Sequence, residues 1–90
     1  PLGTQAYFYR TSAGAEIDLV LELPKRHRWA IEIKRSSAPS VSKGFHIGAA
    51  DLKASARFVV HSGRDSFPLG KHVQAVTLID LQRRLAAAGT

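Results

Sequence analysis

The sequence predicts a single small α/β domain over residues 1–90, with a central mixed β-sheet and the element order βββαββα. Residues 16–22 and 29–34 alternate apolar and polar side chains, which is the two-residue period of β-strands. Apolar residues recur at helical spacing within 41–54, and a short buried strand is expected at 57–61. Because this strand follows a helix, its connection is a crossover, so we expect it to run parallel to an earlier strand.

The first three strands are expected to form two antiparallel hairpins. The aromatic residues within 6–11 favour a strand, and the Thr-Ser-Ala-Gly that ends at Gly14 is typical of a turn. The second strand, 16–22, ends before Pro24. The basic segment 25–28 then forms the turn to the third strand.

The helix at 41–54 has a clear start signal. Either Ser40 or Ser42 can cap its first N–H groups. Gly44 and Gly48 each weaken a helix by about 1 kcal/mol relative to alanine. We therefore expect a bent or loosely ordered helix.

The C-terminal third of the chain contains turn residues and one more strand. A loop with Pro68 and Gly70 precedes a strand at 73–79. Asp80 is expected to cap a last helix at 81–88.

Composition limits the class of protein and of partner. The chain has no cysteine, which excludes disulfides and thiolate metal sites and agrees with a cytoplasmic location. No apolar run approaches the roughly 18 residues that a membrane span needs. The formal charge of +6 favours a polyanionic partner such as DNA.

Charged side chains on the second and third strands form a candidate site. With strict alternation, Leu19 and Leu21 share one strand face with Ile17, and Asp18 lies on the other. Glu32 and Lys34 are two apart, so their side chains share a face about 6.5 to 7 Å apart along the strand. Two acids and one amine on one face can build a metal site. The alternative is a cross-strand salt-bridge cluster on a solvated face.

Asp18 followed by Glu32-Ile33-Lys34 resembles the signature of PD-(D/E)xK nucleases. The resemblance implies a restriction-endonuclease-like fold and Mg²⁺- or Mn²⁺-dependent hydrolysis of DNA phosphodiesters, or descent from such an enzyme. It also implies that Asp18, Glu32 and the Ile33 carbonyl hold the metal, while Lys34 orients the attacking water. Active members often carry a further acid on a helix before the first strand. Glu16, on the face of Asp18, is the alternative ligand here.

The stretches 8–11, 14–18, 31–34 and 75–79 are similar to a narrower group, the uncharacterised domain at the C-terminus of certain prokaryotic AAA-type ATPases. This similarity implies that residues 1–90 are the C-terminal fragment of a larger protein with an upstream ATPase domain. The chain itself contains no P-loop, so no nucleotide site is assigned to it.

Other residues receive weaker assignments. Arg35, Lys43 and Lys53 are candidates for phosphate contact near the site. Glu22 is expected at a solvated strand end, and the four histidines lack the spacing of a zinc site. Two further functions remain open: a non-catalytic domain that binds DNA or the ATPase, and a homo-oligomer formed through an exposed sheet edge.

Overall fold

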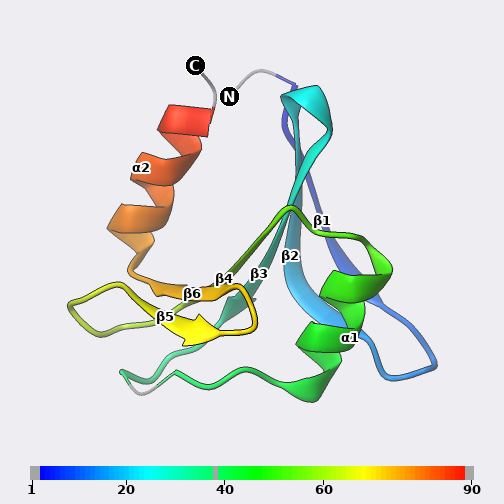
Figure 1. Cartoon of the computed structure of the whole chain (residues 1–90), viewed down its shortest axis with the longest axis horizontal. Helices are drawn as coiled ribbons and strands as arrows, with labels where there is room; N and C mark the ends of the chain where they lie inside the picture. Colours follow the sequence, from blue (N-terminus) through cyan, green and yellow to red (C-terminus); the bar gives the residue numbers. More distant parts are fainter. Residues whose placement is uncertain (1–2, 38, 89–90) are drawn as a thin grey trace.

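The protein is an α/β domain with one mixed six-stranded sheet and two helices, and its computed structural model describes residues 3–37 and 39–88 (Figure 1). The strands lie in the order β1-β2-β3-β4-β6-β5. Their bounds are β1 Gln5–Arg10, β2 Glu16–Leu23, β3 His27–Ile33, β4 Ala56–Val60, β5 Phe67–Gly70 and β6 Val73–Val76. The helices are α1 (Lys43–Asp51) and α2 (Leu78–Ala88), and a short 3-10 turn, η1, covers Pro24–Arg26. Within the described residues, neither helix is long and apolar enough to cross a membrane.

The predicted strand directions are confirmed. β1 pairs with β2 and β2 with β3, both antiparallel. β4 runs parallel to β3, and α1 lies in the crossover that joins them. β6 then runs parallel to β4, so three adjacent strands end at one edge of the sheet.

The helices cover opposite faces of the sheet, and each buries its own apolar cluster. The cluster between the sheet and α1 contains Ile17, Val20, Ala30, Phe45, Ala49, Val59 and Val73, and the sheet face that it covers is called here the α1 side. The cluster between the sheet and α2 contains Leu21, Leu23, Trp29, Ile31, Phe58, Val60, Val76 and Leu81, and the sheet face that it covers is the α2 side. Successive residues of β3 and β4 alternate between the two clusters, as the strand period requires.

A β-bulge in β2 overturns one predicted face. Tyr7 pairs with Val20 and Tyr9 pairs with Ile17, so two steps on β1 match three steps on β2. The extra residue rotates the strand, and Ile17 therefore joins the α1 side with Val20. Strict alternation predicted Ile17 on the face of Leu21, which lies on the α2 side.

The two helix glycines have a packing role. A Cβ on Gly48 would lie 2.7 Å from Cγ1 of Ile17, and one on Gly44 would lie 2.8 Å from the Gly14 carbonyl oxygen. Residues four apart share one helix face, so both glycines let α1 approach β2 closely. The helix is shorter than predicted, since it ends at Asp51.

Two further predictions near the C-terminus are wrong. The segment expected to be a loop is strand β5, which tolerates Pro68 because it is an edge strand. The order is therefore βββαβββα. Helix α2 begins at Leu78, before Asp80, because the Thr77 hydroxyl oxygen accepts from the Asp80 N–H at 3.1 Å.

Candidate functional site

The bulge in β2 creates an opening in the hairpin that the Asp18 side chain fills. Backbone pairing of β2 with β3 ends at Leu19 and Ile31. Beyond this pair the Ile33 N–H donates to Oδ2 of Asp18 at 2.8 Å. The N–H and C=O of one residue in a strand point to the same neighbour, so the Ile33 carbonyl also faces the side of Asp18. The acid of β2 is thus attached to the middle of the Glu32-Ile33-Lys34 motif.

Glu32 is a buried carboxylate attached to the start of α1. Only 7% of the residue is exposed. Its Oε1 accepts from the Ser42 hydroxyl at 2.7 Å and its Oε2 accepts from the Ser42 N–H at 3.2 Å. The same hydroxyl accepts from the Phe45 N–H at 3.1 Å, so Ser42, and not Ser40, is the helix cap. The helix N-terminus also favours the negative charge of Glu32.

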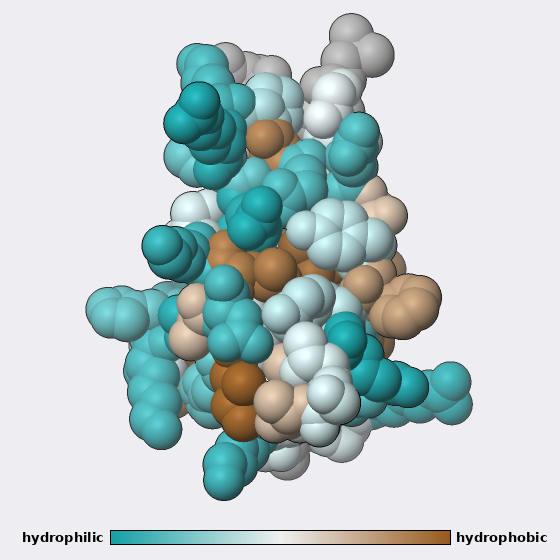
Figure 2. Space-filling model, turned by 90° about the vertical axis from the view of Figure 1, so that its right-hand side faces the viewer, coloured by the Kyte–Doolittle hydropathy of each residue, from teal (hydrophilic) through white to brown (hydrophobic). Residues whose placement is uncertain are grey.

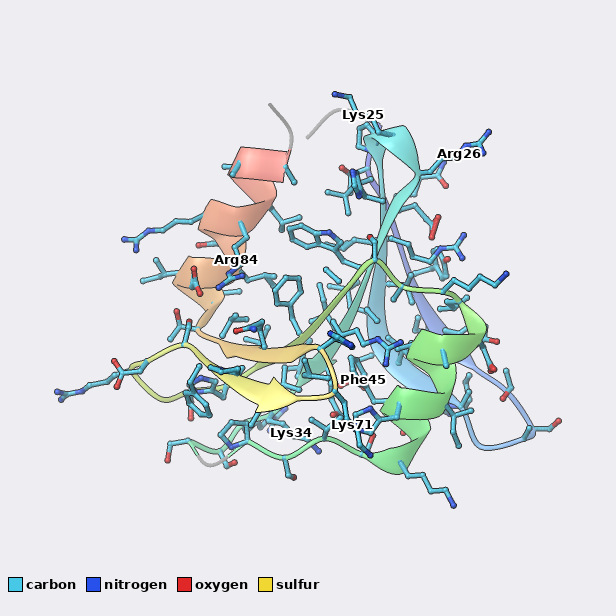
Figure 3. The ribbon with its side chains drawn as sticks, viewed as in Figure 1. Lys25, Arg26, Lys34, Phe45, Lys71 and Arg84 are labelled. Atoms are coloured by element: carbon cyan, nitrogen blue, oxygen red, sulfur yellow. The ribbon has the colours of Figure 1, made fainter. Side chains whose placement is uncertain are left out.

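Lys34 completes the predicted group of side chains. Its Nζ lies 3.8 Å from Oε1 of Glu32, and its side chain is about two-thirds buried. In Figure 3 Lys34 lies at the lower end of the view, far from Lys25 and Arg26 of the β2–β3 turn. The structure therefore brings Glu32 and Lys34 together and joins Asp18 to the residue between them.

The oxygen ligands at this point suit a hard cation. Carboxylate and carbonyl oxygens are the donors that Mg²⁺ takes in proteins, usually together with several waters. Asp18 is exposed, and its Oδ2 accepts from the Ile33 N–H. Glu16, the alternative ligand, forms an exposed ion pair with Arg10 at 2.8 Å. Residues 3–37 and 39–88 contain no group of three or more His, Cys, Asp or Glu side chains that could hold a metal. A cation here would rely on two carboxylates, the Ile33 carbonyl and water.

The three basic candidates do not share one end of the sheet. Arg35 directly follows Lys34, and Lys43 directly follows Ser42, the partner of Glu32. Lys53 lies at the other end, because the Arg28 guanidinium near the start of β3 donates to the Leu52 carbonyl at 2.7 Å. The sequence alone suggested that all three lie near the site.

Glu22 belongs to a structural network and not to a solvated strand end. It accepts from the Tyr7 hydroxyl at 3.0 Å and forms an ion pair with Arg28. The hydrogen bond from Arg28 lowers the pKa of Glu22, and the same bond raises the pKa of Arg28. Burial, followed by the hydrogen bond to Glu22, raises the pKa of Tyr7. Through Arg28 this network joins β1, β2 and β3 to the end of α1.

Sequence reasoning did not assign a role to His61. This residue directly follows β4, at the edge where β3 also ends. Ligands of parallel sheets commonly bind outside the carboxyl ends of the strands. A polar residue immediately after a buried apolar strand was therefore the signal that could have identified it.

The chain matches a family model described as "Domain of unknown function (DUF4143)" over residues 1–81. Two curated proteins are similar, the uncharacterized protein Rv2008c of Mycobacterium tuberculosis and the uncharacterized protein Mb2031c of Mycobacterium bovis. Each is 40% identical over 70 residues, which is 78% of this chain and 16% of the relative. The chain therefore spans about one sixth of the length of these relatives. No solved structure matches it.

Proposed function

This chain belongs to the DUF4143 family, and we propose that it is a nuclease-like domain of the PD-(D/E)xK type that hydrolyses DNA phosphodiesters with Mg²⁺ or Mn²⁺. The observation that supports the proposal most directly is the hydrogen bond from the Ile33 N–H to the Asp18 carboxylate. It holds one acid beside the backbone that links a second acid, Glu32, to an amine, Lys34. A surface salt bridge between Glu32 and Lys34 alone does not need this arrangement.

In this proposal each residue has a separate task. Asp18, Glu32 and the Ile33 carbonyl hold the cation, and Ser42 fixes the Glu32 carboxylate by two hydrogen bonds. Mg²⁺ bound by these residues would act as a Lewis acid and would lower the pKa of the water molecule that it binds. The Lys34 ammonium orients the attacking water and stabilises negative charge that develops on the phosphate.

The charge of the chain supports a nucleic-acid substrate. The formal net charge is +6, and Arg35 and Lys43 are exposed at the end of the sheet where Lys34 lies. Each phosphate contact of this kind releases counterions and strengthens DNA binding at low salt. An upstream ATPase domain is part of the proposal, because short stretches of the sequence are similar to the C-terminal domain of AAA-type ATPases.

Calorimetry and a cleavage assay test this function together. Wild type is expected to bind Mn²⁺ and to cleave DNA, whereas Asp18→Asn loses both because it removes a charged ligand. Lys34→Ala is expected to keep Mn²⁺ binding and to lose cleavage. Lys53→Ala is the matched control, since Lys53 lies at the other end of the sheet. The absence of divalent-cation binding in wild type would contradict the catalytic proposal.

A second candidate function is a non-catalytic interaction domain or homo-oligomer. β1 is an edge strand, and Phe8 on it is 75% exposed. Figure 2 shows the side of the molecule where β1 and α1 lie, with apolar patches across the middle between projecting hydrophilic side chains. An unprotected edge of this kind can pair with another strand. Light scattering over a concentration series tests it: wild type should associate and Phe8→Lys should not. A strict monomer at all concentrations excludes the oligomer.

A further inference from the structure

His61 lies beside Lys34 on the same face of the sheet. β3 and β4 are in parallel register, with Ile33 opposite Val60. The Lys34 N–H donates to the Val60 carbonyl at 2.8 Å, so the next pair in this register is Lys34 and His61. Val60 belongs to the α2 side, so its neighbour His61 points to the α1 side, where Glu32 and Lys34 meet.

The hydrogen bonds of His61 determine which ring nitrogen carries its proton. Nδ1 accepts from the Gly63 N–H at 2.9 Å. In the neutral imidazole the other nitrogen, Nε2, is therefore the donor. The residue is only 5% exposed, and Nε2 is buried with no hydrogen-bond partner among the described residues. A buried donor without an acceptor is costly, and a bound ion or water is one of the few explanations for such a group in a folded protein.

The surroundings indicate what kind of acceptor fits. Lys34 is the strand neighbour of His61 on this face, and the ring of Phe67 lies against the imidazole with centroids 5.6 Å apart. Both Lys34 Nζ and His61 Nε2–H are donors, so an anionic oxygen satisfies them together. Phe67 lies on the edge strand β5 and is 39% exposed, so its ring can move away from the imidazole.

We propose that His61 Nε2–H and Lys34 Nζ together bind a phosphate group, with Phe67 covering the histidine when no phosphate is present. The inference rests on the proposed function, because it assigns this phosphate to the DNA backbone at the same site. His61 is here a substrate-binding residue, and it is not a ligand of the metal.

Imidazole NMR tests the proposal in the absence of any metal. The folded ¹⁵N-histidine chain is titrated in EDTA with thymidylyl-thymidine, which contains one phosphodiester, and separately with inorganic phosphate. We expect the Nε2 resonance of His61 to move along a saturating curve, while that of exposed His72 moves little. Equal small shifts of both histidines, or no shift of His61, overturn the proposal.

Variants separate binding from packing. His61→Phe fills the buried volume without a donor and should weaken thymidylyl-thymidine binding by about tenfold, the loss expected for a hydrogen bond to a charged group. His61→Gln supplies a donor amide and should recover part of that loss. Phe67→Ala should raise the affinity for thymidylyl-thymidine, because no phenyl ring then covers His61 in the free protein. Unchanged affinity in His61→Phe, with fold confirmed by circular dichroism, overturns the proposal.

The metal assay keeps the two proposals distinguishable. If wild type binds no Mn²⁺ but the His61 resonance follows thymidylyl-thymidine, the hydrolytic function fails and phosphate binding stands. If Mn²⁺ binds and DNA is cleaved without any shift of His61, the function stands and the phosphate assignment to His61 fails.

Discussion

The Asp18 carboxylate accepts a hydrogen bond from the Ile33 N–H at 2.8 Å, at the point where the β2 and β3 backbones separate. The Asp18 carboxylate thus takes the place of a backbone carbonyl of β2 as the acceptor of the Ile33 N–H. This relationship depends on the bulge in β2, because the extra residue ends the regular pairing after Leu19. It places an exposed acid next to a backbone carbonyl and a buried acid, which is what distinguishes the site from an ordinary hairpin.

Truncating Asp18 should cost stability, whereas neutralising it should not. Asp18→Ala removes the acceptor of the Ile33 N–H and is expected to destabilise the fold by about 1 kcal/mol. Asp18→Asn retains a carbonyl oxygen in the same place and should lie close to wild type. Urea unfolding measures both free energies. Equal stability of Asp18→Ala and wild type would show that the hydrogen bond contributes nothing.

Ser42 should matter more than Ser40 for stability. Ser42→Ala removes the α1 cap and one donor to the buried Glu32 carboxylate, which together are expected to cost about 2 kcal/mol. The Ser42 N–H still donates to Glu32 in this variant. Ser40→Ala is the control and should unfold at nearly the wild-type urea concentration. The reverse ranking contradicts the assignment of the cap.

Gly48→Ala should destabilise the protein although alanine favours helices. The gain in helix propensity is about 1 kcal/mol. Against it, the new Cβ would lie 2.7 Å from Cγ1 of Ile17, and overpacking of this kind typically costs about 1 to 3 kcal/mol.

A double-mutant cycle isolates this clash. Ile17→Ala removes the opposing atoms, so Gly48→Ala should cost less in that background than in wild type. Identical costs of Gly48→Ala in the two backgrounds would mean that α1 shifts away from β2 without strain.

The Glu22–Arg28 pair should stabilise the fold only at a pH where Glu22 is ionised. Hydrogen bonding from Arg28 lowers the pKa of Glu22 in the folded protein, so its contribution is present above the unfolded pKa of about 4.5. It is lost as pH falls through the lower, folded pKa. Because the pair is partly exposed, we expect Glu22→Gln to cost less than about 1 kcal/mol at pH 7. In urea unfolding, the difference in stability between wild type and Glu22→Gln should be present at pH 7 and absent in strong acid. A difference that does not change with pH would show that the ion pair does not stabilise the fold.

Salt dependence should separate Lys43 from Lys53. If DNA binds at the end of the sheet that carries Lys34, Lys43→Ala removes one phosphate contact and reduces the slope of log affinity against log salt by about 0.9. Lys53→Ala should leave the slope unchanged, since Lys53 lies near Leu52 and Arg28 at the other end. Fluorescence anisotropy with duplex DNA measures both slopes. Equal effects of the two variants would place the DNA elsewhere.

Local patterns were enough to predict the α/β class, the antiparallel hairpins and the parallel return of β4. The two-residue period also placed Glu32 and Lys34 on one face, where they form an ion pair. These features depend on near neighbours in the chain, whose geometry follows from backbone periodicity. The resemblance to PD-(D/E)xK nucleases depends on the same short motifs.

Other features depend on which strands pair and in which register. The bulge that moves Ile17 to the α1 side exists only because β1 and β2 pair with unequal steps. Likewise, β5 becomes a strand because it pairs with β6. His61 lies beside Lys34 because β4 returns parallel to β3. Lys53 lies far from the candidate site because α1 runs back along the strands toward the start of β3. Pairing across long chain separations leaves no periodic signal, so the full candidate site became visible only in the folded sheet.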